Sequence, residues 1–414
     1  MNFLSLQLAI SSLKRNKVRT FLTVLGVVIG ITAVIVMMSV GQGLKLMISQ
    51  QLESFGTNLI QTETRVPTKA NQPAESAQAQ AMGVAVTTMK NSDIEAVRRI
   101  PNIKDAFGGQ MTQLQVTYQD KTRNSLAFGV SEGYLNVDSD KVEFGRFIAP
   151  EEQKGADQVV VLGPDLAKFL FDGQDPLEKK IKIKNLSFRV IGVLAKRGSA
   201  SFINMDDRVV IPLKTIQDRI MGLDYVNYIT ASAIDNTKSD ATAEDIRILL
   251  RQRHRITDIS KDDFQVTTMA EAMSSINTIL GAITLLLIAI AGISLVVGGV
   301  GVSNIMYVSI KERTYEIGLR KALGATAKYI LWQFLWEAVV ITVFGGIIGV
   351  VLGVIFSVLA SLGASLAGYD WPLAISGVAI ITSFGLSVLV GLVFGVYPAR
   401  HAARLSPVDA LRYE

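Results

Sequence analysis

The side chains that could carry out catalysis in this chain are few and scattered. It has two histidines, His254 and His401, and no cysteine, which excludes thiol chemistry and a cysteine-based metal site. Three adjacent acid pairs, Glu151-Glu152, Asp206-Asp207 and Asp262-Asp263, lack a supporting catalytic spacing and are interpreted as solvated or helix-capping residues. We therefore predict no catalytic site and no metal site.

Nucleotide chemistry is not encoded by a phosphate-binding loop either. No G-x-x-x-x-G-K-[ST] sequence occurs in the chain. We therefore expect that this chain does not itself hydrolyse ATP through a P-loop, and we expect no cofactor in it.

The most specific pattern is a short charged segment, Lys311 to Thr326 (KERTYEIGLRKALGAT). It alternates acids with bases, and Gly318 and Gly324 punctuate it. The stretch that follows, Tyr329 to Trp336, is rich in the aromatic residues typical of a membrane–water interface, and Glu337 comes next. A plain loop needs neither the paired glycines nor the alternating charges. The pattern predicts a compact amphipathic element held against one membrane face.

Four long uncharged apolar runs lie around this segment. They extend from Thr20 to Leu44, from Ala272 to Ile310, from Ala338 to Tyr369 and from Trp371 to Ala399. Each exceeds the ~20 residues that a helix needs to cross a bilayer. The net charge of +5 does not indicate a nucleic-acid partner, because the cations cluster at the ends of these runs.

The hydrophilic block between the first and second runs predicts a large separate domain. Strands are expected at Leu114 to Tyr118, Ser125 to Val130, Val159 to Leu162, Lys180 to Lys184, Phe188 to Leu194 and Val209 to Ile211; helices are expected from the cap Ser92-Asp93 to Arg99 and at Pro164 to Phe171, Leu213 to Met221 and Ala241 to His254. The expected fold class is an α+β membrane protein, with four transmembrane helices and a large extracytoplasmic α+β domain between helices 1 and 2. We expect two lobes, split near Gly145 and rejoined near Asn227, and a mobile loop at 66–86. Phe264 to Asn277 is expected as a stalk helix that leads back to the second run.

Orientation follows from lysine and arginine near the runs. These are Lys14, Arg15, Lys17 and Arg19, then Lys311, Arg313, Arg320, Lys321 and Lys328, and finally Arg400, Arg404 and Arg412. Because basic segments remain in the cytoplasm, both termini are predicted inside and the large domain outside a multi-pass inner-membrane protein. His254 and His401 then lie on opposite sides. The first run exceeds the length of a signal-peptide core and is interpreted as an uncleaved span.

Glycines four residues apart mark two of the runs. They are Gly345, Gly349 and Gly353 in the third run and Gly391 and Gly395 in the fourth. Such rows let helix backbones approach closely in lipid. Packing within the chain is the simpler interpretation, and packing across a dimer is the alternative.

The charged segment resembles the R-x-x-E-I-G-x-R-K-A-x-G-A signature of FtsX-like permeases of ABC transporters, the MacB-type group. The matching residues are Arg313, Glu316, Ile317, Gly318, Arg320, Lys321, Ala322, Gly324 and Ala325. Val159 to Gly222 and the tail Gly395 to Glu414 look like the same group, as does the topology of one span, a large domain and three spans. In contrast to the MacB exporter, this chain shows no fused ATPase domain.

The resemblance implies that the signature residues couple the chain to a cytoplasmic ABC ATPase, expected as a separate subunit. It also implies a second permease copy, either a homodimer or a heterodimer with a sister permease, and an adaptor protein outside, which we place around Gly145 to Asn227. Members of this group are thought to transmit motion instead of conducting substrate. The near absence of ionisable residues from the runs is consistent with that.

The resulting boundaries are a cytoplasmic amphipathic N-terminal helix (1–19), the first span (20–42), the outer domain with stalk helices (43–275), the second span (276–308), the coupling segment (309–337), the third span (338–366), an outer turn (367–372), the fourth span (373–397) and a cytoplasmic tail (398–414). The expected function is efflux of antibiotics, peptides or other amphipathic compounds. Lipoprotein release is an alternative, as is a cell-division or sensing assembly that activates an outer hydrolase or reports a ligand. No residue pattern names the substrate.

Overall fold

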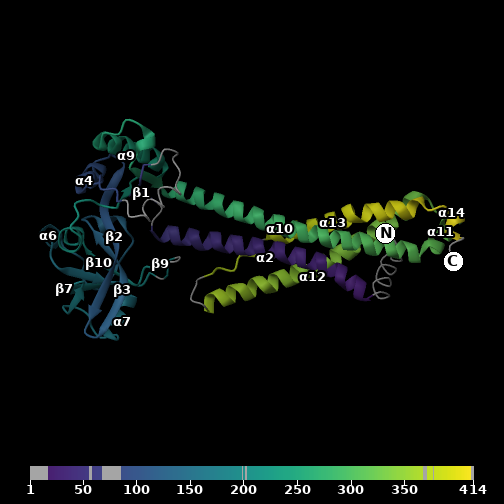
Figure 1. Ribbon diagram of the computed structural model, residues 1–414, viewed down its shortest axis with the longest axis horizontal. Coiled ribbons are helices and arrows are strands. Elements are labelled where there is room, and N and C mark those ends of the chain that lie inside the picture. Colours follow the sequence, from purple (N-terminus) through teal and green to yellow (C-terminus); the bar gives the residue numbers. More distant parts are fainter. Residues whose placement is uncertain are drawn as a thin grey trace. The chain divides into compact units, whose positions relative to one another are not determined.

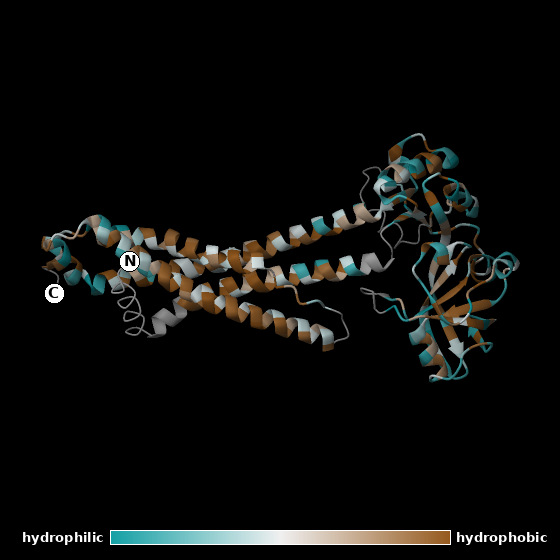
Figure 2. Ribbon diagram, turned by 180° about the vertical axis from the view of Figure 1, so that it is seen from behind, coloured by the Kyte–Doolittle hydropathy of each residue, from teal (hydrophilic) through white to brown (hydrophobic). Residues whose placement is uncertain are grey.

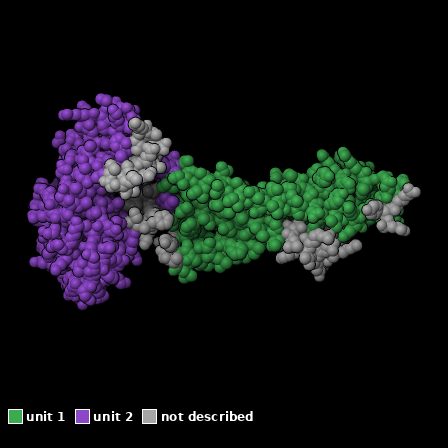
Figure 3. Space-filling view, in the orientation of Figure 1, with its two compact units in different colours: residues 1–47, 276–414 green, residues 48–275 purple. Residues whose placement is uncertain are grey.

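The computed structural model describes residues 17–55, 58–67, 85–197, 199–200, 203–366, 371–375 and 377–411. The chain divides into two compact units (Figure 3). Residues 1–47 and 276–414 form the helical unit, and residues 48–275 form the sheet unit. The predicted N-terminal helix before Lys17, most of the loop 66–86 and most of the outer turn 367–372 lie outside the described residues.

Four long apolar helices make up most of the helical unit, as the sequence predicts (Figures 1 and 2). They are α2 (Lys17–Phe55), α10 (Met269–Glu312), α12 (Ala327–Leu366) and α13 (Gly377–Arg404), accompanied by the short helices α11 (Thr314–Ala322) and α14 (Pro407–Leu411). An unbroken helix satisfies its own backbone hydrogen bonds, which lipid cannot do. With 39, 44 and 40 residues, α2, α10 and α12 are longer than one bilayer crossing requires.

The stalk segment before α10 corrects one prediction. The sequence pattern predicts a helix from Phe264 to Asn277, but Phe264–Thr268 form strand β12, and α10 begins only at Met269. β12 pairs antiparallel with β1 (Leu59–Thr64). Its buried positions alternate, so a two-residue period decides the local structure here.

A ten-stranded mixed sheet forms the centre of the sheet unit (Figure 1). Besides β1 and β12, its strands are β2 (Ile103–Tyr118), β3 (Lys121–Val130), β4 (Val142–Gly145), β5 (Val159–Leu162), β6 (Lys180–Ile183), β7 (Leu186–Leu194), β10 (Arg208–Pro212) and β11 (Tyr228–Ala233). Their order is β12-β1-β11-β2-β3-β10-β5-β7-β4, and β6 pairs with β2 and β7. β8 (Ser199–Ala200) and β9 (Ile203–Asn204) form a separate pair. Each predicted strand coincides with or overlaps a strand of the large sheet.

The large sheet is continuous, so the predicted split into two lobes near Gly145 is wrong. Gly145 is the last residue of β4 and pairs with Gly192 of β7. The long strand β2 connects the two sides of the sheet, because its residues 103–109 pair with β11 and its residues 109–118 pair with β3. The strands beyond β3 therefore continue the same sheet and do not form a separate lobe.

Helices pack on this sheet and complete its core. They are α4 (Asn91–Arg98), α5 (Tyr134–Val137), α6 (Pro150–Gly155), α7 (Pro164–Phe171), α8 (Leu213–Thr215) with a π-helix (Ile216–Met221), and α9 (Ser239–His254). Apolar residues of α4, α7 and α9 share one core with the strands. The N-cap of α4 is Lys90, whose N–H donates to the Asp93 carboxylate at 2.7 Å, so the predicted cap at Ser92-Asp93 lies two residues too late.

Candidate functional site

The helix α11 contains most of the signature and packs closely on α14. Ile317 is buried, and a Cβ added to Gly318 would lie 2.6 Å from the Cβ of Ala410. Nonbonded carbon atoms need about 3.5–4 Å, so a larger residue at position 318 would push the two helices apart. The signature segment and the C-terminal tail therefore form one structural element.

Lys321 connects α11 to the end of α13. Its Nζ donates to the carbonyl oxygens of Ala403 at 3.0 Å and Leu405 at 2.5 Å. Carbonyls at a helix C-terminus lack partners within the helix and carry partial negative charge. The lysine therefore caps α13 and holds α11 beside it.

Two arginines connect the signature to α12. Arg320 bonds to Glu316 one turn earlier at 2.5 Å and to Oε1 of Gln333 in α12 at 3.0 Å. Arg313, directly before α11, forms an ion pair with Glu337 at 3.4 Å. Glu337 is buried, and a buried carboxylate requires a charged or hydrogen-bonding partner. Arg313 therefore accounts for the acid at the head of the third apolar run.

The other face of α11 is apolar and open. Tyr315, Leu319 and Leu323 are 57%, 44% and 80% exposed. Residues four apart lie on one side of a helix, so these three form a stripe. Their spacing could have been read from the sequence, but they lie outside the matched signature positions. Gly324 follows with φ +98°, a conformation that glycine adopts readily.

The glycines of α12 lie against α2. This row consists of Gly345, Gly349 and Gly353. A Cβ on Gly349 would lie 3.0 Å from the Cβ of Ile31, and one on Gly353 would lie 2.8 Å from the Cβ of Ile35. Among the described helices, the row therefore lies at a contact within the chain, which is the simpler of the two interpretations.

The glycines of α13 lie against α12 in the same manner. A Cβ on Gly391 would lie 2.9 Å from the Cα of Val339, and one on Gly395 would lie 2.6 Å from the Cβ of Ala338. Small residues permit such contact between helices in lipid. The two rows therefore hold α12 between α2 and α13.

A third close contact, between α2 and α10, is missing from the sequence-based predictions. A Cβ on Gly298 would lie 2.8 Å from the carbonyl carbon of Gly26 and from the nitrogen of Val27. A Cβ on Gly30 would lie 2.7 Å from Cγ of Leu295. The signal was available, because Gly26 and Gly30 form a G-x-x-x-G pattern in the first run.

Two family models match this chain over most of its length. Residues 20–249 match the MacB-like periplasmic core domain, and residues 288–407 match the FtsX-like permease C-terminal region. The chain belongs to the MacB/FtsX-like family of ABC transporter permeases. The MacB-like core domain thus includes most of the sheet unit, and the FtsX-like region includes α11 to α13.

Two relatives of known sequence agree with this assignment, and one solved structure is similar over part of the chain. The macrolide export ATP-binding/permease protein MacB of Bdellovibrio bacteriovorus is 38% identical over 97% of this chain, which spans 60% of that protein. The uncharacterized ABC transporter permease YknZ of Bacillus subtilis is 33% identical, with 99% of each chain covered. The solved periplasmic region of MacB from Actinobacillus actinomycetemcomitans is 21% identical with a TM-score of 0.46, covering 56% of this chain and 97% of that structure.

The acid pairs of the sheet unit are mostly bonded within the chain. The partners are Arg146 for Glu152 (2.6 Å), the N–H of Arg197 for Asp206 (2.8 Å), Arg123 for Asp207 (2.8 Å), Arg251 for Asp262 (2.7 Å) and His254 for Asp263 (2.8 Å). Glu152 also accepts the N–H of Ala149, as a helix-capping residue does. The prediction that these acids are solvated or helix-capping therefore holds for Glu151, which is exposed, and for Glu152, and it is wrong for the other four residues.

His254, the last residue of α9, contacts two acids of the sheet unit. Its Nδ1 lies 2.8 Å from Asp263, and its Nε2 lies 3.5 Å from Asp93 of α4. Burial alone would lower the pKa of His254, but its bonds to Asp263 and Asp93 raise it to about 9. Burial alone would raise the pKa of Asp93, but its contacts with His254, Lys90 and Arg253 lower it to about 2. This cluster is a buried structural ion network.

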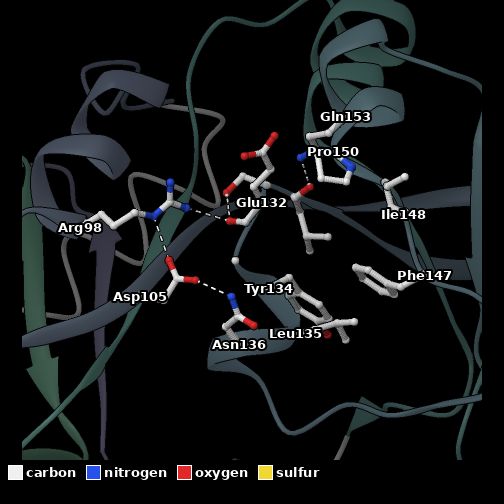
Figure 4. A pocket seen from close by; sticks show the side chains of 14 residues that line it. Arg98, Asp105, Glu132, Tyr134, Leu135, Asn136, Phe147, Ile148, Pro150 and Gln153 are labelled. Atoms are coloured by element: carbon white, nitrogen blue, oxygen red, sulfur yellow. Dashed lines mark hydrogen bonds and ion pairs between the residues drawn. The ribbon is translucent and has the colours of Figure 1, made fainter.

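A polar pocket of about 500 Å³ lies beside α5 and α6 (Figure 4). Arg98 donates to Asp105 at 2.8 Å and to the carbonyl of Glu132 at 3.0 Å. Asn136 donates to the same aspartate at 2.7 Å. These charged groups satisfy one another, so they offer little to a charged ligand. Leu135, which is 42% exposed, gives the pocket an apolar margin.

Proposed function

We propose that this chain couples ATP hydrolysis by a separate ATPase subunit to motion of its MacB-like core domain, for efflux of antibiotics, peptides or other amphipathic compounds. The observation that carries the proposal is the two-sided character of α11. One face is tied to α12, α13 and α14, and the other presents Tyr315, Leu319 and Leu323. An exposed apolar stripe on an anchored helix suits docking to a partner protein.

The proposed orientation has α11 and both termini in the cytoplasm and the core domain outside, supported by the lysines and arginines around the spans. α10 ends at Glu312 and α11 begins at Thr314, so the two helices are nearly continuous in the chain. α10 and α2 each continue from residues of the helical unit into residues of the sheet unit. A displacement of α11 would therefore be passed outward along α10.

The test is co-purification of the full chain with its co-expressed ATPase, followed by measurement of ATP hydrolysis. Leu319→Glu places a charge in the stripe and should remove most of the bound ATPase. Leu319→Met, which keeps the apolar surface, should retain it. Glu316→Gln and Arg320→Gln loosen α11 from α12 and should lower export while the ATPase stays bound.

Two results would refute the coupling role. One is an ATPase that never co-purifies with the wild-type chain. The other is export that survives substitution of Glu316, Arg320 and Leu319 alike. An adaptor outside the membrane, which we place around Gly145 to Asn227, would be identified by the same co-purification.

A second copy of the chain is part of the proposal, and α10 supplies a seam for it. Exposed apolar residues recur at alternating spacings of four and three: Ile279, Ile283, Leu286, Ile290, Ile293, Val297 and Val300. A repeat of seven residues is typical of helices that pack against a partner helix. Because the chain has no cysteine, Ile293→Cys should give a disulfide-linked dimer on mild oxidation. Phe344→Cys, on the exposed side of α12, should not. If Ile293→Cys does not cross-link, this face of α10 contacts lipid and not a second copy of the chain.

A further inference from the structure

A second pocket in the sheet unit, of about 480 Å³, is mainly apolar and plays no part in the coupling proposed above. Aromatic residues from three strands line it, namely Phe107 of β2, Phe128 of β3 and Tyr228 of β11. Three methionines line it as well: Met111, Met205 and Met269. The volume suits a drug-sized molecule, and methionine side chains adapt to ligands of different shape.

Gly109 makes room for one of these rings. It pairs with Tyr228 across β2 and β11. A Cβ at position 109 would overlap the Cζ atom of Tyr228, so the ring occupies the space that a side chain would fill. The strand pairing therefore builds an aromatic surface into the lining of the pocket.

The charges at one end of the pocket cancel. Asp138 and Asp140 both bond to Arg197, at 2.8 and 2.9 Å, and Asp140 also bonds to Arg208 at 2.6 Å. Arg208 is 2% exposed, and its Nε–H has no acceptor among the described residues. This end contributes no net charge, but it does leave one donor for a polar group of a ligand.

The other end keeps an uncompensated negative charge. Glu63 lines the pocket and pairs in register with Tyr228 across β1 and β11. Its hydrogen bond is to the uncharged amide of Gln61, at 2.7 Å, and no lysine or arginine of the described chain forms an ion pair with it. Glu63 is an exposed residue of β1, and loss of hydration beside the pocket raises its pKa, with no cation of the described residues nearby to lower it.

We propose that this pocket binds a small amphipathic cation, with its apolar body on the aromatic and methionine side chains and its positive group beside Glu63 and the ring of Tyr228. A carboxylate next to an aromatic face attracts a cation by charge and by cation–π interaction. An anion would be repelled by Glu63, and a neutral ligand would leave its charge uncompensated. The inference rests on the proposed efflux function and narrows its amphipathic substrates to cations.

The test measures binding to the full chain in phosphatidylcholine nanodiscs, without the ATPase. The probes are rhodamine 6G, a cationic amphiphile, and the neutral dye BODIPY 493/503, each followed by fluorescence anisotropy against empty nanodiscs. Glu63→Gln should weaken rhodamine 6G binding about fivefold and leave the neutral dye unchanged. Met111→Ala should weaken both dyes. Glu143→Gln, an exposed carboxylate of β4, is the matched control and should change neither.

Three results would overturn the inference: a dye signal equal to that of empty nanodiscs, rhodamine 6G binding unchanged by Glu63→Gln, or an equal loss in Glu143→Gln. Because no ATPase is present, these results are independent of the coupling test. A chain that binds the dye but no ATPase would overturn only the coupling role, and the reverse result would overturn only the pocket.

Discussion

The contact between α2 and α10 gives a sharp prediction about the membrane helices. In Gly298→Ala, the new Cβ would lie 2.8 Å from two backbone atoms of α2, in Gly26 and Val27. Backbone atoms cannot rotate away as a flexible side chain can, so the helices must separate by several tenths of an ångström. Overpacking of this kind costs about 1–3 kcal/mol.

Gly292→Ala on the same helix is the matched control. No described atom outside the local helix lies within 4 Å of its added Cβ. Both substitutions gain about 1 kcal/mol of helix propensity, because alanine is a better helix former than glycine. That gain cancels in the comparison. Gly298→Ala should therefore be about 1–3 kcal/mol less stable than Gly292→Ala.

The measurement is unfolding of the purified full chain in mixed micelles by increasing sodium dodecyl sulfate, followed by tryptophan fluorescence. All three tryptophans, Trp332, Trp336 and Trp371, belong to the helical unit, so the signal reports on that unit. If the two variants unfold at the same detergent fraction, the close approach of α2 and α10 is wrong. A more stable Gly298→Ala would refute the reasoning outright.

Three further predictions concern single contacts. The pKa of His254 is about 9 in the fold against an ordinary 6.5, so its stabilising effect is fully present below pH 6.5 and is lost as pH rises through 9. His254→Gln should flatten the decline in thermal stability over that interval, which amounts to about 3 kcal/mol at most, as followed by circular dichroism. Lys321→Met leaves the carbonyls at the end of α13 without their donor and should lower the stability of the helical unit by about 1–3 kcal/mol in the detergent assay, whereas Lys328→Met should not. Gly109→Ala would displace the ring of Tyr228 and should lower the melting temperature of the full chain, whereas Gln113→Ala, on an exposed site of the same strand, should have little effect.

Strong local patterns made much of the fold predictable from the sequence. Four apolar runs mark the long helices, and α7 spans the predicted residues Pro164 to Phe171. The pairing of distant strands was not predictable in the same way. Nothing near Gly145 indicates that β4 pairs with β7, or that β2 carries both halves of one sheet. The short stretch Phe264–Thr268 shows the same limit, since five residues satisfy a strand period and a helix period about equally well.

The signature segment was found from its residue types, but the direction in which its side chains point could not be predicted. Arg320, which also bonds to Glu316, faces inward because it bonds to Gln333 of α12. Lys321 donates to carbonyl groups about 80 positions later in the sequence, at Ala403 and Leu405. A pattern within α11 cannot contain those partners. The glycine rows had the same limitation, because spacing identifies a close contact without identifying the helix on the other side.

The inward direction of the signature has a physical reason. The contacts that hold α11 in place can be made by few residue types. Position 318 has no room for a Cβ, position 321 needs a long cationic side chain, and position 313 needs a cation opposite Glu337. The proposed docking stripe requires only apolar area, which many side chains supply. The signature should therefore control how faithfully α11 moves with α12 and α13, whereas Leu319 and Leu323 should control how tightly a partner holds it. On this reasoning, substitutions in the two sets separate transmission from affinity, and a variant of Gly318 should retain its ATPase while losing export.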